Sequence, residues 1–218
     1  MTTKLLLAGG TGVVGNEVLQ AAAQSELEII TVGRRPSGNA ATEIVASFAD
    51  LPMLPAADRA ICVLGTTIGR AGSRSAFRAV DYDAVMTFAT AAKNTGAWHF
   101  MVVTAVGANS QSPVFYSRIK GEVERDLTGL GFSRLDIVRP GLLLGRRQER
   151  RPVESLLKMI APVTDRCMIG SWRRYRSIHP GEIARFLLSL RDCEEPGVFV
   201  HHFDEINALP ADGEPGLA

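Results

Sequence analysis

Cysteine and long apolar runs are scarce in this chain of 218 residues, and each scarcity argues against a class of protein. The three cysteines are odd in number and lack the spacing of metal ligands, so we expect neither a disulfide framework nor a metal site. No window approaches the roughly 20 apolar residues of a membrane-spanning helix, so we expect no membrane partner. The formal net charge of +1 gives no electrostatic reason to expect nucleic acid. A small molecule is the expected ligand.

The start of the chain and its length bear on its location and its organisation. The first apolar run begins at Leu5, with no charged region and cleavage site before it, which favours a cytoplasmic protein. With 46% apolar and 22% charged residues the chain has the composition of one ordinary globular domain. We expect that domain over residues 1–207. Residues 208–218 are rich in Pro, Gly, Asp and Ala, which is typical of a flexible tail.

Strand-like apolar runs alternate with helical patterns from end to end, which predicts an α/β fold with a doubly wound parallel sheet. The expected strands are Lys4–Ala8, Glu28–Val32, Glu43–Ser47, Ala60–Leu64, His99–Thr104, Arg134–Val138 and Val198–Phe203. The expected helices are Val13–Gln24, Ser75–Thr95, Phe115–Thr128, Val153–Ile160 and Gly181–Leu190. Right-handed crossovers collect the carboxyl ends of the strands along one edge, where ligands bind in such sheets.

The run from Gly9 to Gly15 joins the first strand to the first helix in the order that a dinucleotide site requires. Gly9 permits the tight turn, Gly12 lets backbone amides approach a pyrophosphate, and Gly15 lets the helix pack close to the strand. The N-terminus of the helix then faces the phosphates with free N–H groups and the positive end of its dipole. An ordinary strand-to-helix turn is the alternative. The residues expected to hold the phosphates are Gly9, Thr11, Gly12, Val13, Val14 and Gly15.

The second expected strand ends in Gly33-Arg34-Arg35, where an NAD-selective site usually offers an acidic residue. A guanidinium can clamp a 2′-phosphate with two hydrogen bonds and stack on adenine. Arg34 and Arg35 therefore favour NADP(H) over NAD(H). The alternative is that both side chains point into water.

Tyr116 and Lys120 lie one turn apart on the same face of the helix expected over 115–128. An ammonium beside a phenol favours the phenolate and lowers its pKa from about 10, so Tyr116 can exchange a proton with a carbonyl or alcohol oxygen. Lys120 can also hold the nicotinamide ribose. The chain has only four lysines and three tyrosines, so a chance pair at this place is uncommon. A solvent-facing helical pair is the alternative.

These motifs resemble the short-chain dehydrogenase/reductase superfamily and, more narrowly, its HIV Tat-interacting oxidoreductase-like (CC3) group. The strings that carry the resemblance are Gly9–Gly15, Leu64–Thr67, Tyr116–Glu124 and Arg139–Leu144, and the likeness runs over about residues 4–190. The resemblance implies a Rossmann fold, bound NADP(H) and hydride transfer assisted by a Ser-Tyr-Lys set, in which Tyr116 and Lys120 fill two roles. Thr104 is the only hydroxyl residue at the end of the fifth strand, where the family usually has the serine, and it can donate the same hydrogen bond.

The resemblance also extends, more loosely, to residues that follow other strands. It implies adenine contact at Asp50 and Leu51, a loop bordering the cofactor at Gly65, Thr66 and Thr67, and a turn beside the nicotinamide at Pro140 and Gly141. Ordinary turn chemistry is the alternative for each. His179, before the last long helix, is expected to be a structural hydrogen-bonding residue rather than a catalyst.

Residues 145–180 interrupt the alternation and are expected to form a small substrate lobe above the strand ends. The segment carries Arg146, Arg147, Arg150, Arg151, Arg173, Arg174 and Arg176. These arginines can receive a phosphate or a carboxylate of a substrate, although a solvated surface is the commoner explanation of such runs.

We predict an NADP(H)-dependent oxidoreductase for a small carbonyl or alcohol substrate, with Tyr116 as general acid and base. The alternative is a non-catalytic regulatory or assembly protein that senses NADP(H) and contacts a protein partner. Sugar-nucleotide epimerisation is less favoured, because the C-terminal part leaves little room for a nucleotide sugar. A homodimer through the helices over 75–95 and 115–128 stays open.

Overall fold

The computed structural model describes residues 4–23, 25, 27–40, 42–144, 168 and 170–208. Its sheet has seven parallel strands in the order β3-β2-β1-β4-β5-β6-β7. The strands are β1 (Lys4–Ala8), β2 (Glu28–Gly33), β3 (Thr42–Val45), β4 (Arg59–Cys62), β5 (His99–Val103), β6 (Arg134–Val138) and β7 (Gly197–His201). The strand order reverses between β1 and β4, which is where a doubly wound sheet binds its ligand. The expected α/β fold is confirmed.

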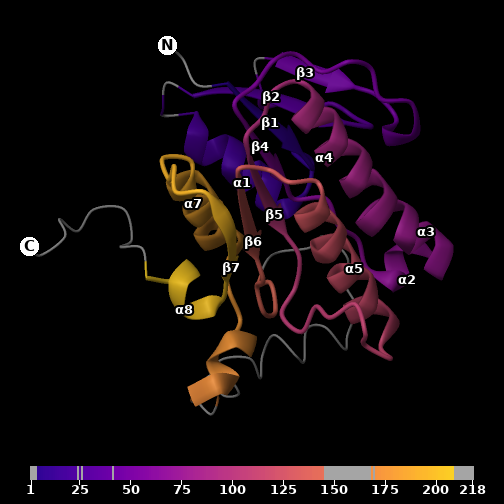
Figure 1. Ribbon diagram of the computed structural model, residues 1–218, viewed down its shortest axis with the longest axis vertical. Coiled ribbons are helices and arrows are strands. Elements are labelled where there is room, and N and C mark those ends of the chain that lie inside the picture. The colour runs from indigo at the N-terminus through magenta and orange to yellow at the C-terminus, as the bar shows by residue number, and fades with distance from the viewer. Residues whose placement is uncertain are drawn as a thin grey trace, which may run out of the picture.

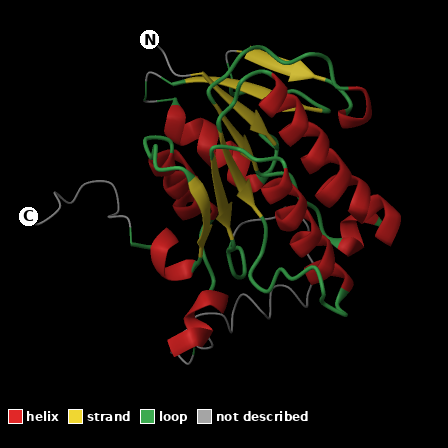
Figure 2. Ribbon diagram, in the orientation of Figure 1, coloured by secondary structure: helices red, strands yellow, loops and turns green. Residues whose placement is uncertain are grey.

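Helices cover both faces of the sheet, α1 and α7 on one and α4 and α5 on the other (Figures 1 and 2). The α-helices are α1 (Val13–Ala22), α2 (Ile68–Ala71), α3 (Arg74–Arg78), α4 (Ala84–Asn94), α5 (Phe115–Gly129), α7 (Pro180–Leu190) and α8 (Phe203–Ile206). Two 3-10 helices, η1 (Phe48–Asp50) and η3 (Gly170–Tyr175), and one π-helical turn, η2 (Ala79–Asp83), complete the described elements. The helix expected over 153–160 lies outside the described residues.

The core is divided in two by the sheet, because successive side chains of a strand point to opposite faces. Leu5 and Leu7 of β1 face the cluster beneath α1 and α7, whereas Leu6 and Ala8 face the cluster beneath α4 and α5. All four are completely buried, which explains why β1 is a continuous apolar run and not an alternating one. Each fully buried leucine contributes about 1.5–3 kcal/mol through loss of apolar surface from water.

The long helix expected over 75–95 is built differently. It consists of α3, the π-helical turn η2 and α4, and Ser73 begins it by accepting a hydrogen bond from the Ala76 N–H at 3.1 Å. The third expected strand ends early because Ser47 caps η1, accepting from the Ala49 N–H at 3.3 Å. Short helices such as η1, α2 and α8 were not expected, because three or four residues hold no complete period of a helical pattern.

Beyond the carboxyl ends of β6 and β7 lies η3, the orange helical segment in Figure 1. Residues 145–167, with five of the arginines of the expected lobe, lie outside the described part of the chain. Arg173 Nε lies 2.8 Å from Asp204 Oδ1, and Arg176 Nε donates to the Met168 carbonyl at 3.0 Å. In the described ranges, no helix is long and apolar enough to cross a membrane.

Candidate active site

The glycine turn after β1 leaves no room for side chains at two of its positions. Gly9 has a φ of +98°, and a Cβ there would lie 2.9 Å from the backbone of Val63. A Cβ on Gly15 would lie 2.2 Å from the Gly9 carbonyl oxygen, so α1 approaches the turn more closely than any other residue type allows. The first turn of α1 carries no acidic side chain. The geometry therefore suits an anionic group above the helix N-terminus.

A cleft joins this turn to the end of β2; it is partly open to solvent and has an accessible volume of about 70 Å³. Its lining residues are Gly9, Gly10, Thr11, Thr31, Val32, Gly33, Arg34, Arg35, Ser37, Phe48 and Leu64. The structure thus brings Arg34 and Arg35 together with the glycine turn, as the sequence predicted. Val14 is buried in the core and does not line this cleft.

Glu43 of β3 organises the loop after β2. One carboxylate oxygen of Glu43 accepts the backbone N–H groups of Ser37 and Gly38 at 2.9 Å each and also the Ser37 hydroxyl. The hydrogen bond from that hydroxyl is the main reason why the pKa of Glu43 lies below its usual value. The sequence analysis did not identify Glu43, which holds the loop that follows the two arginines.

Asp50 and Leu51 border the same region from the other side. They line a second hollow between η1 and α4, and Phe48 lines both hollows. Asp50 is exposed and Leu51 is half-buried. The two residues that the resemblance assigned to adenine contact therefore lie beside the cleft, next to its Phe48 wall.

Lys120 and Asp81 form a buried ion pair between α5 and η2, with 2.8 Å between Nζ and Oδ1. The backbone N–H of Thr66 donates to Asp81 Oδ2 at 2.8 Å. A Cβ added to the exposed Gly65 would lie 3.8 Å from Lys120 Nζ, so the ammonium lies directly beneath the loop that follows β4. The expected site residues Gly65, Thr66 and Lys120 are thus brought together, with Asp81 as an unexpected fourth member.

Tyr116 lies one turn before Lys120 on α5 and is half-buried. Its ring packs at a tilt against Phe77, with 5.6 Å between the ring centroids. Burial lowers the pKa of Lys120, but the negative charges of Asp81 and of an ionised Tyr116 outweigh burial and raise that pKa above its usual value. Lys120 is therefore an ammonium at neutral pH, close enough to Tyr116 for the two charges to interact.

Burial raises the pKa of the acidic groups beside Lys120, whereas it lowers the pKa of Lys120 itself. It raises the pKa of Asp81, against the attraction of Lys120 and the hydrogen bond from Thr66. It also raises the pKa of Cys62, at the end of β4, to about 12. Cys62 is consequently a thiol, and the charged groups in this part of the site are Lys120 and Asp81.

Thr104 follows β5 and has a partner that the sequence analysis did not identify. Its hydroxyl donates to Glu124 Oε1 at 2.6 Å, and Arg139 Nε donates to the same oxygen at 3.0 Å. Glu124 is buried on α5, four residues after Lys120 and eight after Tyr116. That spacing places all three on one helix face and was the available signal. The proton of the Thr104 hydroxyl points to Glu124.

The remaining expected positions make turn and cap contacts. The Thr67 hydroxyl accepts from the Arg70 N–H at 3.2 Å and begins α2. The Pro140 carbonyl accepts from the Val106 N–H at 2.9 Å, which ties the loop after β6 to the loop after β5. A Cβ on Gly141 would lie 2.2 Å from the Arg176 carbonyl oxygen, so this glycine permits close contact with the segment before α7. His179 precedes α7, and its backbone N–H donates to Glu182 Oε2 at 2.8 Å.

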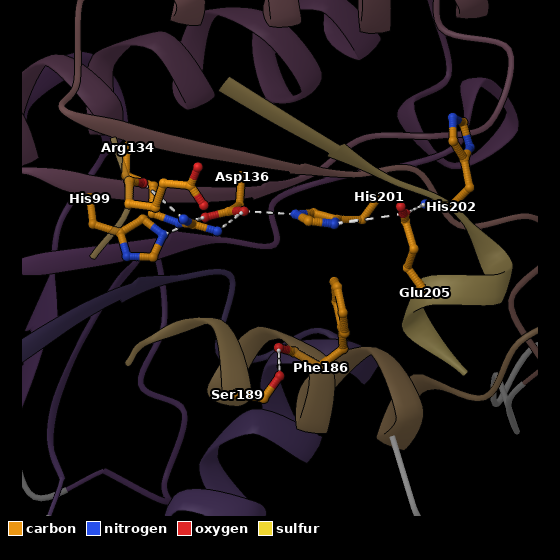
Figure 3. Close-up of polar contacts among 9 residues, drawn as sticks. His99, Arg134, Asp136, Phe186, Ser189, His201, His202 and Glu205 are labelled. Atoms are coloured by element: carbon orange, nitrogen blue, oxygen red, sulfur yellow. Dashed lines mark hydrogen bonds and ion pairs between the residues drawn. The ribbon is translucent and has the colours of Figure 1, made fainter. Parts of the chain in front are cut away.

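A second buried polar cluster lies under α7, centred on Asp136 of β6 (Figure 3). Asp136 contacts Nε2 of His99 at 2.6 Å and Nε2 of His201 at 2.7 Å, and it accepts two hydrogen bonds from Arg134 at 2.6 and 3.0 Å. Burial opposes ionisation, but the hydrogen bonds from two histidines and an arginine outweigh it and hold the pKa of Asp136 far below its usual range. Among the described residues, no group of three or more His, Cys, Asp or Glu side chains is arranged to hold a metal ion.

The strand order defines a Rossmann-like α/β fold. Within that fold class, the chain belongs to the HIM1 family, which matches residues 28–170. It is 33% identical over 179 residues to the protein named fmp52, mitochondrial, of Aspergillus fumigatus, covering 75% of this chain and 76% of the relative. It is also 33% identical over 190 residues to FMP52, mitochondrial, of Candida albicans, covering 79% of each chain.

Solved structures share the fold at low identity. A UDP-N-acetylglucosamine 4-epimerase from Methanobrevibacter ruminantium superposes with a TM-score of 0.69 at 16% identity, covering 93% of this chain and 77% of that one. The human epimerase family protein SDR39U1, solved with NADPH, gives a TM-score of 0.63 at 20% identity, covering 92% of this chain and 74% of that one. At these identities the likeness concerns the fold.

The expectation of a cytoplasmic protein is corrected by the relatives, which are named as mitochondrial proteins. Receptors read the address of a protein from short targeting segments, whereas the composition of a folded domain reflects packing and solubility. The lack of a charged region and cleavage site before the first apolar run was therefore not a sufficient basis for a statement on location.

Proposed function

We propose that the chain is an NADP(H)-dependent oxidoreductase for a small carbonyl or alcohol substrate, similar in its chemistry to the CC3 group. One observation carries the proposal: the half-buried Tyr116 lies one helical turn from the buried Lys120, directly beneath the loop that follows β4. An ammonium and a phenol in this arrangement at the carboxyl edge of a doubly wound sheet are placed to act on a bound cofactor and substrate.

The residues of the cleft fit NADP(H). Gly9 and Gly15 let the turn after β1 pack against the backbone of Val63 and let α1 pack against that turn, which is the close packing that a diphosphate-binding turn uses. Arg34 and Arg35 border the cleft and are exposed, so they are available to clamp a 2′-phosphate. We assign adenine contact to Asp50 and Leu51 beside Phe48. When bound, NADP(H) supplies or accepts a hydride at the carbon that carries the substrate oxygen.

Tyr116 handles the proton that accompanies the hydride. In reduction, the phenol donates its proton to the oxygen on which negative charge develops, and the resulting phenolate regains a proton from solvent. In oxidation, the phenolate takes the proton of the alcohol. Lys120 stays an ammonium at neutral pH and lies one helical turn from the phenol in both directions of the reaction.

A second candidate, an NADP(H)-sensing protein without turnover, is favoured by the contacts of Thr104. The Thr104 hydroxyl donates to Glu124 and so does not offer its proton to a substrate oxygen in this conformation. Such a protein would use the cleft for the cofactor and signal its presence to a protein partner.

A binding measurement followed by a turnover assay separates the candidates. We expect purified protein to bind NADPH more tightly than NADH by calorimetry, and to oxidise NADPH with at least one member of a panel of aldehydes, ketones and quinones. Tyr116→Phe should lower turnover by about 10²- to 10⁴-fold, the usual contribution of a general acid, while NADPH affinity is kept.

Tyr82→Phe is the matched control, because the Tyr82 hydroxyl bonds Asp126 on α5 and not the site. Full turnover in Tyr116→Phe contradicts the enzymatic proposal. Tight NADPH binding without turnover across the panel supports the second candidate, and absence of binding contradicts both.

A further inference from the structure

Asp81 is a carboxylate that the cofactor site contains but that no motif of the sequence announced. It is completely buried, and it contacts Lys120 Nζ at 2.8 Å and the Thr66 N–H at 2.8 Å. It thereby connects three elements of the site: η2, α5 and the loop after β4. A buried charge is costly unless it is paired and hydrogen-bonded, and both conditions are met here.

The π-helical turn η2 directs two neighbouring residues toward α5. Asp81 meets Lys120, and Tyr82 donates to Asp126 at 2.6 Å. The contact of Asp81 lies at the site, whereas that of Tyr82 lies six residues further along α5. π-helical turns are rare, and they occur frequently at functional sites.

We propose that Asp81 is the positioning residue of the Tyr116–Lys120 pair, and that it keeps Tyr116 in the protonated form that reduction of a carbonyl requires. Its carboxylate holds the Lys120 ammonium beneath Gly65 and balances its charge. The phenol of Tyr116 then faces a nearly neutral ion pair instead of a lone cation, keeps its proton at neutral pH and acts as a proton donor to a carbonyl oxygen. The inference rests on the proposed function, because it needs Tyr116 to be the acid.

The charges around this end of α5 support that balance. Cys62 on β4 stays a neutral thiol because burial raises its pKa to about 12. The loop over 104–114 contains no charged residue. Arg74 on α3 and Arg118 on α5 lie over the ring of Phe115, at 5.3 and 5.8 Å from its centroid. Asp81 is therefore the carboxylate that compensates Lys120.

The test measures the ionisation of Tyr116 directly, in the cofactor-free protein. Ultraviolet absorbance follows tyrosinate formation with rising pH, and the same titration of Tyr116→Phe is subtracted to isolate Tyr116 from Tyr82 and Tyr175. In Asp81→Asn, Tyr116 should ionise about one pH unit lower, a tenfold gain in acidity, because the Lys120 charge is no longer balanced.

The control is Asp83→Asn, which removes a carboxylate from the same turn. Asp83 is largely exposed and lies 4.0 Å from Arg78, so its loss should leave the titration of Tyr116 unchanged. A merely structural role of Asp81 would not move the titration of a folded variant. Unchanged or weaker acidity of Tyr116 in folded Asp81→Asn overturns the inference.

A double variant covers the case in which Asp81→Asn does not fold. Asp81→Asn combined with Lys120→Met removes both charges and leaves no unpaired ion in the interior. If the pair is balanced, Tyr116 should ionise at the same pH as in the unaltered protein. A rise in its pKa by one unit or more means that Lys120 acted as an uncompensated cation, and it refutes the proposed role of Asp81.

The result of the titration can be distinguished from the result of the turnover assay that tests the proposed function. The titration needs neither cofactor nor substrate, so it can succeed in a protein that turns nothing over. Conversely, NADPH-dependent turnover that requires Tyr116, together with an unmoved titration, leaves the proposed function intact and overturns the assignment of Asp81 alone.

Discussion

Asp81 and Asp136 are two of the buried carboxylates that have basic partners in the described part of the chain, and their surroundings differ in one respect. Both carboxylate oxygens of Asp136 have hydrogen-bond partners, namely two histidines and an arginine that donates two hydrogen bonds. This cluster lies between the sheet and α7 (Figure 3). Asp81 has one ammonium and one backbone amide, and that ammonium lies one turn from a half-exposed phenol beneath an exposed glycine. A buried charge marks a candidate site when its partner lies directly beneath an exposed loop, and it marks a structural link when its partners lie between the sheet and a helix.

Asp136→Ala should have the largest effect of these substitutions, a loss in the free energy of unfolding. The substitution leaves Arg134 and two histidines without their shared acceptor, and loss of one member of a buried ion pair costs about 3–5 kcal/mol in the free energy of unfolding. Chemical denaturation measures that cost, and NADPH affinity of the folded fraction should stay the same because β6 does not line the cleft. Asp192→Ala, at a mostly exposed position, is the control and should change stability little. A stable Asp136→Ala protein would contradict the structural role.

Thr104→Val should have a smaller effect and tests whether the hydroxyl serves Glu124 or a substrate. Loss of a hydrogen bond to a charged acceptor costs about 2 kcal/mol in the free energy of unfolding, and Thr104→Ser should keep most of it. Because the proton is committed to Glu124, turnover in Thr104→Val should fall less than about tenfold, well short of the loss in Tyr116→Phe. Losses of equal size in the two variants would show that Thr104 donates to the substrate.

The smallest effect is a pH dependence of stability that comes from His99. Burial lowers the pKa of His99 in the folded state, against the attraction of Asp136, so the folded protein disfavours the protonated form. Stability from this group is complete above the unfolded pKa of about 6.5 and declines as the pH falls toward the lower folded value. The decline is a fraction of the about 1.4 kcal/mol per pH unit that one fully titrating group can give.

Denaturation curves between pH 8 and pH 5 would show this decline in the unaltered protein and a shallower one in His99→Gln. His202, whose pKa is also lowered by burial, remains in the variant and accounts for the residual slope. Equal slopes in the two proteins would mean that His99 does not carry the effect.

Periodic apolar patterns predicted most of the fold, because the central strands are buried on both faces and the long helices on one. β1 and β6 begin and end as expected, and α5 differs by one residue. The sequence did not reveal η2, since the pattern of apolar residues continues through it, or the lone helical turns, which are too short to show a period. These elements depend on tertiary contacts that no local window contains.

The candidate site also consists of features that are local in the sequence and features that depend on tertiary contacts. The glycine turn and the Tyr116–Lys120 pair are local in sequence, and the structure brings each together as expected. Asp81 lies 39 residues before Lys120, and its partnership depends on how η2 meets α5. Glu124 was within reach of sequence analysis through its spacing, whereas Thr104 as its donor was not, because the two belong to different elements.

The π-helical turn η2 also sets the rotation of α4 about the helix axis relative to α3. An α-helix advances about 100° per residue, so one residue removed from η2 would rotate α4 by that angle relative to α3. Either Phe88 and its neighbours would swing away from the sheet, or the carboxylate of Asp81 would turn from α5 toward water. A single-residue deletion in η2 therefore either removes apolar side chains of α4 from the core or breaks the Asp81–Lys120 ion pair, and no side-chain substitution can prevent both losses.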